Sequence, residues 1–355
     1  MKSRQINLFS ALATAVFLTA CGGGGGGSAP VATTSTPTTP VVTPAVTPVV
    51  APVVAAGYTL ANPPTSSYTA GSAQRAMFNS LNQVRLGGGF GALEQDLRLD
   101  QAASAHADYV ITNYFPGGIG VPSFSTIQPD GWITAHTETA GTTGFTGSRP
   151  VNRIIAAGYS PINSGENLDV IVGKNVGEEP DMTVCMSNLL NTVFHRAALL
   201  DTTYLNIGFG ISKPTIAPNG FILRACVLDF GAKEIAPVLA QSWVGFYPFD
   251  GQTGVPVTMK SEVPDPLPSA PIKGGPIGIQ TASLQNLTVN NFTLRDASGQ
   301  VVNAKVVTRA DTTYLRTNEA YLVPIGSLIV NSTYFVTFTG TSNGTIVNKN
   351  WSFKT

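Results

Sequence analysis

The sequence predicts an α+β protein in which a domain of helices and strands is followed by a domain of strands alone. Two stretches, residues 72–86 and 97–114, carry apolar residues at helical spacing. The last third of the chain instead shows short strand-like runs separated by turns. Between these regions, residues 247–268 are rich in proline, glycine and aspartate, which disfavour both helix and central strand. We therefore expect folded domains at residues 58–240 and 241–355.

The chain begins with the pattern of a secretory signal peptide over residues 1–20. Lys2 and Arg4 precede an apolar run that is shorter than the roughly 20 residues needed to span a bilayer. The run ends at Cys21 in the sequence Leu-Thr-Ala-Cys, which resembles a bacterial lipobox. That resemblance implies cleavage before Cys21 and attachment of a lipid to it. The signal peptide implies an exported protein. Because glycine rather than aspartate follows Cys21, the sorting rule of Gram-negative lipoproteins implies that it is anchored at the outer membrane, on its periplasmic face or at the cell surface.

Residues 21–57 are expected to form a tether between the lipid and the folded part. Glycines follow Cys21, and proline, threonine, valine and alanine make up most of the remainder. Proline fixes φ and removes an amide donor, so this segment should be extended and contain neither helix nor strand.

The charge of the chain argues against a nucleic-acid partner. It has 20 basic and 20 acidic residues, and charged residues make up only 11% of the sequence. The sequence has no basic patch or stripe of the kind that nucleic-acid binding requires.

The cysteine content predicts a disulfide. With a lipid on Cys21, the cysteines that remain are Cys185 and Cys226. An even pair in an oxidising compartment is a candidate disulfide, and two free buried thiols are the alternative.

The three histidines of the chain lie within the first folded domain, and the first is on a predicted helix. The helix over residues 72–86 should stop at the three glycines that follow it. In the helix over residues 97–114, His106 falls on the apolar face among alanines. A histidine there is either a core residue holding one hydrogen bond or part of a cavity wall.

His136 lies in a long segment, residues 116–147, that has little periodicity. Loops of this length in compact domains are often functional, and a histidine on one is free to point into a cleft. A short helix is expected next, over residues 150–157, with proline at its start and glycine after its end.

The remaining candidate residues lie on a strand and a helix. Glu166 is expected at the entrance of a strand over residues 168–172, and His195 on a single helix over residues 181–200. Strands should follow at residues 204–212 and 221–230, joined by a Pro-Asn-Gly turn.

Short motifs follow one another in a fixed order over residues 72–232. They are Ala102-Ala103 with His106-Ala107, a loop histidine, Arg153 with Gly158-Tyr159, Gly165-Glu166-Asn167, His195-Arg196 and Ile207-Gly208-Phe209-Gly210. This order resembles the bacterial branch of the CAP superfamily, named for cysteine-rich secretory, antigen 5 and pathogenesis-related 1 proteins. The resemblance implies a three-layer α-β-α sandwich with a small antiparallel sheet and a central cleft.

The resemblance also implies that His136, Glu166 and His195 line the cleft. The animal and plant members carry a second glutamate shortly before the second histidine, where bacterial members often have serine, and the corresponding segment of this chain has no acidic residue. Glu138 is a hypothetical substitute for it. Further candidate ligand contacts are His106, Glu138, Asn167, Thr192 and Arg196.

Three roles remain open for these residues. Two imidazoles and a carboxylate suit a divalent metal such as zinc, although their spacing matches no local metal motif. The same groups could serve general acid–base catalysis in an extracytoplasmic hydrolase or peptidase, with Ser164, Ser187 or Thr192 as the hydroxyl. The third option is a polar cluster that shapes a binding cleft. The CAP resemblance favours binding of a lipid-like molecule or a protein partner.

The last domain is expected to be a β-sandwich. Strands are predicted over residues 277–281, 287–294, 301–307, 320–324, 333–339 and 350–354. The segments around Asn331-Ser332-Thr333-Tyr334 and Trp351-Ser352-Phe353 resemble bacterial immunoglobulin-like domains, and we expect Trp351 to lie in the core.

Overall fold

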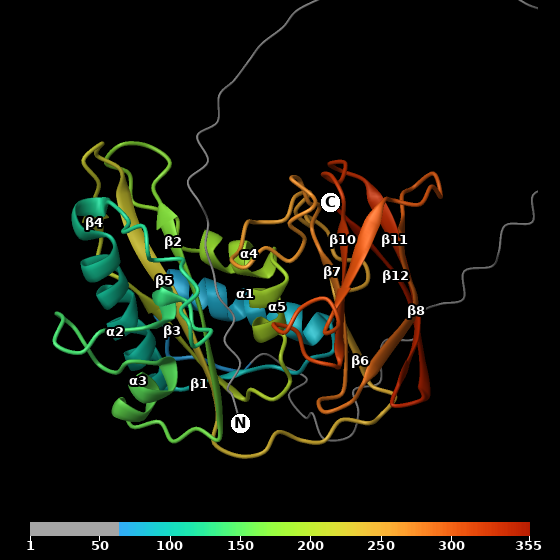
Figure 1. The fold of residues 1–355 in the computed structure, drawn as a ribbon, viewed down its shortest axis with the longest axis horizontal. Helices are drawn as coiled ribbons and strands as arrows, with labels where there is room; N and C mark the ends of the chain where they lie inside the picture. Colours follow the sequence, from blue (N-terminus) through green and yellow to red (C-terminus); the bar gives the residue numbers. More distant parts are fainter. Residues whose placement is uncertain (1–63) are drawn as a thin grey trace, which may run out of the picture. The chain divides into compact units, whose positions relative to one another are not determined.

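The computed structural model describes residues 64–355, so the predicted signal peptide, Cys21 and the whole predicted tether lie outside the described residues. The first half of the described chain contains one mixed sheet (Figure 1). Its strands are β1 (Glu94–Gln95), β2 (Asn163–Val172), β3 (Asn206–Ile211), β4 (Thr215–Ile216) and β5 (Ile222–Ala232). They run in the order β1-β3-β5-β2, with β4 paired to β5; β1 is parallel to β3 and the other pairings are antiparallel.

Helices cover both faces of this sheet, which confirms the predicted α+β class and gives three layers (Figure 1). The helices are α1 (Ala73–Gly87), α2 (Leu97–Tyr114), α3 (Pro150–Ala156), α4 (Val184–Leu190) and α5 (Phe194–Leu199), with 3-10 turns η1 (Pro116–Gly118) and η2 (Thr134–His136). Helices α2 and α3 lie on one face, and α1, α4 and α5 lie on the other. The glycines of β3 permit this packing, since a Cβ on Gly208 would come within 2.2 Å of the α2 backbone.

Each face of the sheet has its own apolar core. On one side, α1 and α4 pack against β3 and β5 through residues that include Phe78, Leu189 and Phe230. On the other, α2 packs through Tyr109 and Val110. Within the first cluster, Cys185 of α4 and Cys226 of β5 form the predicted disulfide, with their Cα atoms 6.6 Å apart. A disulfide across a chain separation of 41 residues typically stabilises a fold by about 2–4 kcal/mol.

The prediction of a single helix over residues 181–200 is wrong, because the helix is interrupted between α4 and α5 at residues 191–193. The side chain of Asn191 donates to the carbonyl of Thr258, and the amides of Val193 and Phe194 bond to a carboxylate instead of to helix carbonyls. These partners lie far along the chain, so local periodicity could not reveal them.

The second half of the described chain forms two sheets that enclose a separate core. The strands are β6 (Val244–Tyr247), β7 (Ile277–Thr281), β8 (Leu287–Arg295), β9 (Ala304–Thr308), β10 (Glu319–Pro324), β11 (Thr333–Ser342) and β12 (Thr345–Lys354). One sheet has the order β6-β7-β10-β9 and the other β12-β11-β8. Trp351 is 5% exposed and lies in the core between them, as expected. The immunoglobulin-like type of this sandwich stays a prediction.

Residues 248–276, which we call the connector, join β6 to β7 without a regular helix or strand. The connector packs against the first half of the chain: the amide of Lys260 donates to the carbonyl of Asn191 at 2.8 Å. Val263 packs against the core cluster that contains Ile133 and Ala135. Among residues 64–355, no helix has the length and apolar character needed to cross a membrane.

Candidate functional site

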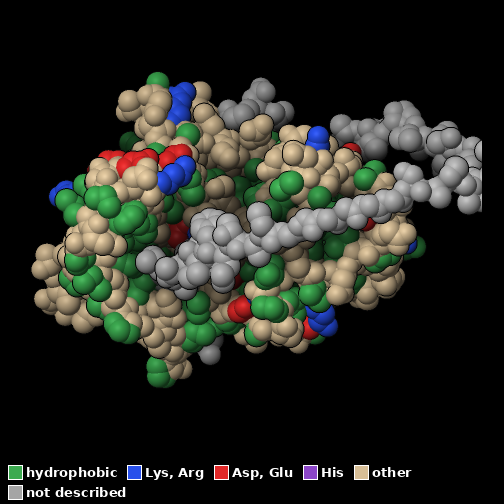
Figure 2. Space-filling model, turned by 90° about the horizontal axis from the view of Figure 1, so that it is seen from above, with side chains coloured by type: hydrophobic (Ala, Val, Ile, Leu, Met, Phe, Trp, Pro, Cys, Tyr) green, Lys and Arg blue, Asp and Glu red, His purple; other side chains and the backbone are tan. Residues whose placement is uncertain are grey.

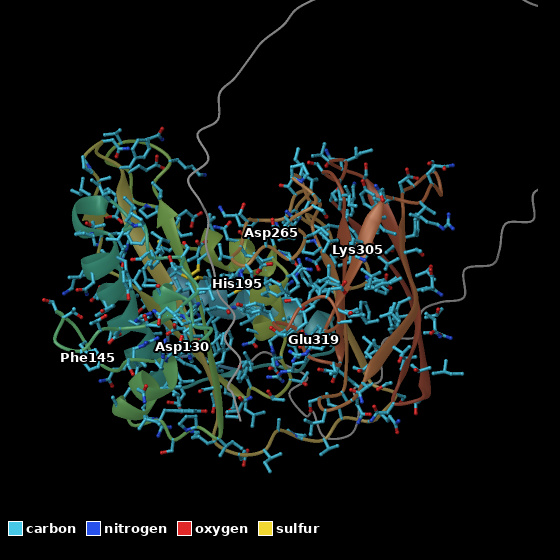
Figure 3. All side chains as sticks on the ribbon, viewed as in Figure 1. Asp130, Phe145, His195, Asp265, Lys305 and Glu319 are labelled. Atoms are coloured by element: carbon cyan, nitrogen blue, oxygen red, sulfur yellow. A yellow bond between two sulfur atoms is a disulfide. The ribbon has the colours of Figure 1, made fainter. Side chains whose placement is uncertain are left out.

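The three histidines come from three different elements and are all buried. His106 lies on α2, His136 ends the 3-10 turn η2, and His195 lies on α5, where Figure 3 labels it. Their exposed fractions are 0%, 2% and 0%, and none of them is visible on the face drawn in Figure 2.

His106 is fully hydrogen-bonded. Its Nδ1 lies 2.9 Å from Glu138 Oε1 and its Nε2 2.9 Å from the carbonyl oxygen of Ala135. Burial alone would raise the pKa of Glu138, but the hydrogen bond and charge of His106 outweigh it and lower that pKa. Both ring nitrogens therefore donate to acceptors, which requires a positively charged imidazolium. Glu138 is therefore the hydrogen-bond partner of His106. It does not take the place of the second glutamate that other CAP proteins carry near the second histidine.

Glu166 holds the second histidine. The Nδ1 atom of His136 lies 2.7 Å from Glu166 Oε1, and Arg153 of α3 donates to Glu166 Oε2. Burial alone would raise the pKa of Glu166, but Arg153, His106 and His136 outweigh it and hold that pKa far below its usual value. The ionised carboxylate accepts the Nδ1 proton of His136, which leaves Nε2 with a lone pair.

The position of Glu166 differs from the prediction. Strand β2 begins at Asn163, so Glu166 lies within the strand instead of at its entrance, and it is paired in register with Asp229 of β5. Asp229 is fully buried, and burial together with the negative charge of Glu166 raises its pKa well above the usual value. Burial beside the ionised Glu166 thus favours the protonated form of Asp229.

His195 is held at the same ring nitrogen as His136. Its Nδ1 lies 3.1 Å from Thr192 Oγ1 and 3.2 Å from Oε2 of Glu262, a connector residue. Thr192 donates its own proton to the carbonyl of Leu189 at 2.7 Å. From β2, Asn167 donates to the backbone carbonyl of His195 at 3.0 Å, which fixes the start of α5 against the sheet.

The Nε2 atoms of His136 and His195 are buried and have no hydrogen-bond partner among residues 64–355. A buried polar atom without a partner costs about 1–3 kcal/mol, so such atoms call for an explanation. Burial lowers the pKa of both rings. For His136, the hydrogen bond and charge of Glu166 partly oppose this lowering, whereas the charge of His136 lowers the pKa of His195 further. Two neutral rings therefore each present one free nitrogen.

Arg196, which the sequence suggested as a ligand contact, instead joins the two halves of the chain. It is 2% exposed, its Nε donates to the carbonyl of Leu190 at 2.5 Å, and its Nη1 donates to the carbonyl of Pro276. Its guanidinium lies 4.5 Å from the ring centroid of Tyr247. These contacts use its donors within the protein.

The side chains do not assemble a metal centre in the part of the chain that the structure describes. Within residues 64–355, no group of three or more His, Cys, Asp or Glu residues is arranged to hold a metal ion. Of the proposed set, Glu166 already uses both oxygens for His136 and Arg153. We therefore derive no metal chemistry from His136, Glu166 and His195.

Residues 78–216 match the family model described as CAP, the cysteine-rich secretory protein family. These residues form a CAP domain. The match includes all three histidines and Glu166 but ends before Asp229 and Glu262. A comparison with curated proteins gives no match to the chain.

Three members of the buried cluster were not predicted as site residues. Arg153 was part of a CAP motif without a role. Asp229 is the one acidic residue in a strand that is apolar apart from Arg224, a signal that could have identified it. Glu262 lies in the turn-rich junction, 67 residues after His195, and no local pattern distinguishes it.

Proposed function

We propose that this protein is an exported binding protein whose CAP domain holds an uncharged polar group of a lipid-like ligand or partner between His136 and His195. The observation that supports the proposal is the pair of buried Nε2 atoms without partners. Each ring contacts the side chain of a glutamate at Nδ1, so its orientation is set before a ligand arrives. Because both rings are neutral, they suit a hydroxyl better than a carboxylate or phosphate.

A hydrolase is the second candidate. The His136–Glu166 pair, with Nε2 free, has the arrangement of a general base that could activate water. A serine-type triad is not supported, since it needs the acid and the hydroxyl on opposite ring nitrogens. Thr192 and Glu262 both lie at Nδ1 of His195, and Ser187 donates to the carbonyl of Val184. Binding therefore fits the geometry better than covalent catalysis.

Binding of a fluorescent long-chain alcohol tests the proposal. We expect the alcohol to bind more tightly than the fatty acid of equal chain length, because ionised carboxylates cannot donate to a neutral ring. His136→Ala and His195→Ala should each weaken alcohol binding roughly two- to tenfold, the effect of losing one hydrogen bond of about 0.5–1.5 kcal/mol. Equilibrium fluorescence titration of the full chain measures both effects.

The control is Asp265→Asn, on the connector but paired with Lys273 at the surface (Figure 3). Its affinity should equal that of the unaltered protein. Equal affinities for all four proteins would reject the binding site. Release of product from a p-nitrophenyl ester that disappears in His136→Ala would instead favour the hydrolase.

We also propose that the protein is anchored at the outer membrane by a lipid on Cys21. The sequence pattern around Cys21 supports this location, and the residue itself lies outside the described part of the chain. We expect cells fed a radiolabelled fatty acid to label the unaltered protein and not Cys21→Ser. Equal labelling of the two proteins would remove the anchor from the proposal.

A further inference from the structure

The two free ring nitrogens of the candidate site are closed off from solvent. The Nε2 atoms of His136 and His195 are buried and have no hydrogen-bond partner among residues 64–355. A ligand that bonds to these atoms must therefore displace part of the protein. Helices and strands that carry the apolar cores are costly to displace, so the moving part is expected in a segment without regular structure that contacts the site.

Four residues of the connector, 260–263, fit this description, and we call them the strap. At its tip, Glu262 accepts from the amides of Val193 and Phe194, at 2.7 Å and 3.0 Å. The same carboxyl group lies 3.2 Å from Nδ1 of His195. The tip of the strap is thus bonded to the start of α5 and to one of the two histidines.

The strap also contacts the elements on either side of α5. Val263 packs against the apolar cluster that includes Ala135, and the turn η2 continues from Ala135 to His136. The amide of Lys260 donates at 2.8 Å to the carbonyl of Asn191, in the break between α4 and α5. The strap therefore joins the part of the chain that carries His136 to the part that carries the second histidine.

The residues that flank the strap are held by the sandwich and the rest of the connector. Met259, just before it, donates its amide to the carbonyl of Lys273 at 2.8 Å and packs against a core cluster that includes Tyr321 of β10. Leu267, shortly after it, is 8% exposed and lies in the same cluster. The strap is thus a short loop with fixed ends and with its middle resting on the CAP domain.

There is open space for the strap to move into. A pocket of about 160 Å³ is lined by residues 258–262 and by Pro271, Ile272 and Lys273 of the returning connector. A packed protein interior leaves no space of this size. A segment held at its ends, bonded at its tip and bordered by a pocket has the arrangement of a lid that hinges at its ends.

We propose that the strap is a lid, which opens to admit a ligand to the free nitrogens of His136 and His195 and then closes over it. The proposal stands on the bonds of Glu262 to the start of α5, made by a loop with fixed ends beside a pocket. It deepens the proposed function, on which it rests for its ligand. Entry to the site then depends on a segment beyond the CAP match.

Hydrogen exchange of the ligand-free full chain, read residue by residue by NMR, tests the lid. The first amides of a helix have no partner within it, so those of Val193 and Phe194 are protected by Glu262. The amide of Lys260 is protected by Asn191. We expect these three amides to share one protection factor, at least roughly 100-fold below that of the β5 amides. Protection equal to that of β5 would mean that the strap opens only when the domain unfolds, and would overturn the proposal.

Glu262→Ala tests whether the strap moves as one unit. The variant loses the bonds at the tip but keeps the donor amide of Lys260, which should exchange about tenfold faster. Asp296→Ala is the matched control, because Asp296 also accepts two backbone amides, those of Ser298 and Gln300, in an exposed turn. An unchanged Lys260 rate in Glu262→Ala would contradict the proposal. Exchange in the unaltered protein decides the question even where the variant is unstable.

Chemical modification tests whether the strap controls access to the site. Diethyl pyrocarbonate acylates neutral imidazole nitrogens, and the Nδ1 atom of His136 is bonded to Glu166, not to Glu262. His136 should react about tenfold faster in Glu262→Ala than in the unaltered protein. His106, with both ring nitrogens hydrogen-bonded, is the internal reference. Equal His136 rates would reject the strap as the lid. Neither test uses a ligand, so failure of alcohol binding would reject the proposed function alone.

Discussion

Replacing Arg153 with methionine is expected to lower the free energy of unfolding by about 3–5 kcal/mol, the cost of removing one partner from a buried ion pair. Arg153 is 1% exposed and donates to Glu166, and its Nε lies 3.7 Å from Glu138 Oε1. Together with the imidazolium of His106, it balances these two buried carboxylates. The variant would leave two negative charges against one positive charge inside the domain.

Arg98→Met is the matched control. Arg98 also pairs with a carboxylate, that of Asp96, but its side chain is 43% exposed, so its loss should lower the free energy of unfolding far less than the loss of Arg153 does. Urea unfolding of both variants under oxidising conditions measures the difference. Equal losses for Arg98→Met and Arg153→Met would show that the buried charges are not coupled as described.

The local parts of the fold could be predicted from the sequence. Helix α2 has the predicted bounds because its signals are local: Asp96 accepts from the amide of Arg98 at its start, and its small and apolar residues recur at helical spacing. The break between α4 and α5 could not be predicted, because it depends on Thr258 and Glu262, which follow more than 60 residues later.

The candidate site likewise combines residues that the sequence identifies with partners that only the fold supplies. The residues identified by the CAP resemblance, His136 and Glu166, do lie in contact. The electrostatic partners that set their charge, Arg153 and Asp229, depend on which strands and helices become neighbours. A histidine in the sequence indicates a possible proton donor or acceptor, but its tautomer is set by the group at its other nitrogen, which only the fold supplies.

Residues 78–216 alone would lack the acidic side chain that contacts His195. In this chain the acid beside His195 follows the matched residues and is carried by the connector to the sandwich. The sandwich therefore contributes to the proposed function, because Arg196 of α5 contacts both Pro276, the last residue of the connector, and the ring of Tyr247 in β6, which helps hold the connector beside α5.

Stability should fall as pH rises through the range in which Glu262 ionises. Its folded-state pKa of about 8 lies above its ordinary value of 4.5, so the folded protein binds one more proton than the unfolded chain between these values. The stabilisation is complete below pH 4.5 and is lost by pH 8. It amounts to at most about 5 kcal/mol, taking about 1.4 kcal/mol for each pH unit.

Comparison with Glu262→Gln isolates this contribution. Asp169, whose burial raises its pKa to about 6, and Asp229 act in the same direction and remain in both proteins. The glutamine loses the Phe194 contact and should lower stability at pH 5, but it cannot titrate. We therefore expect the difference in unfolding free energy between the two proteins to shrink steadily from pH 5 to pH 8 in urea unfolding. Parallel stability profiles would mean that Glu262 is already ionised at pH 5 and that burial does not raise its pKa in this way.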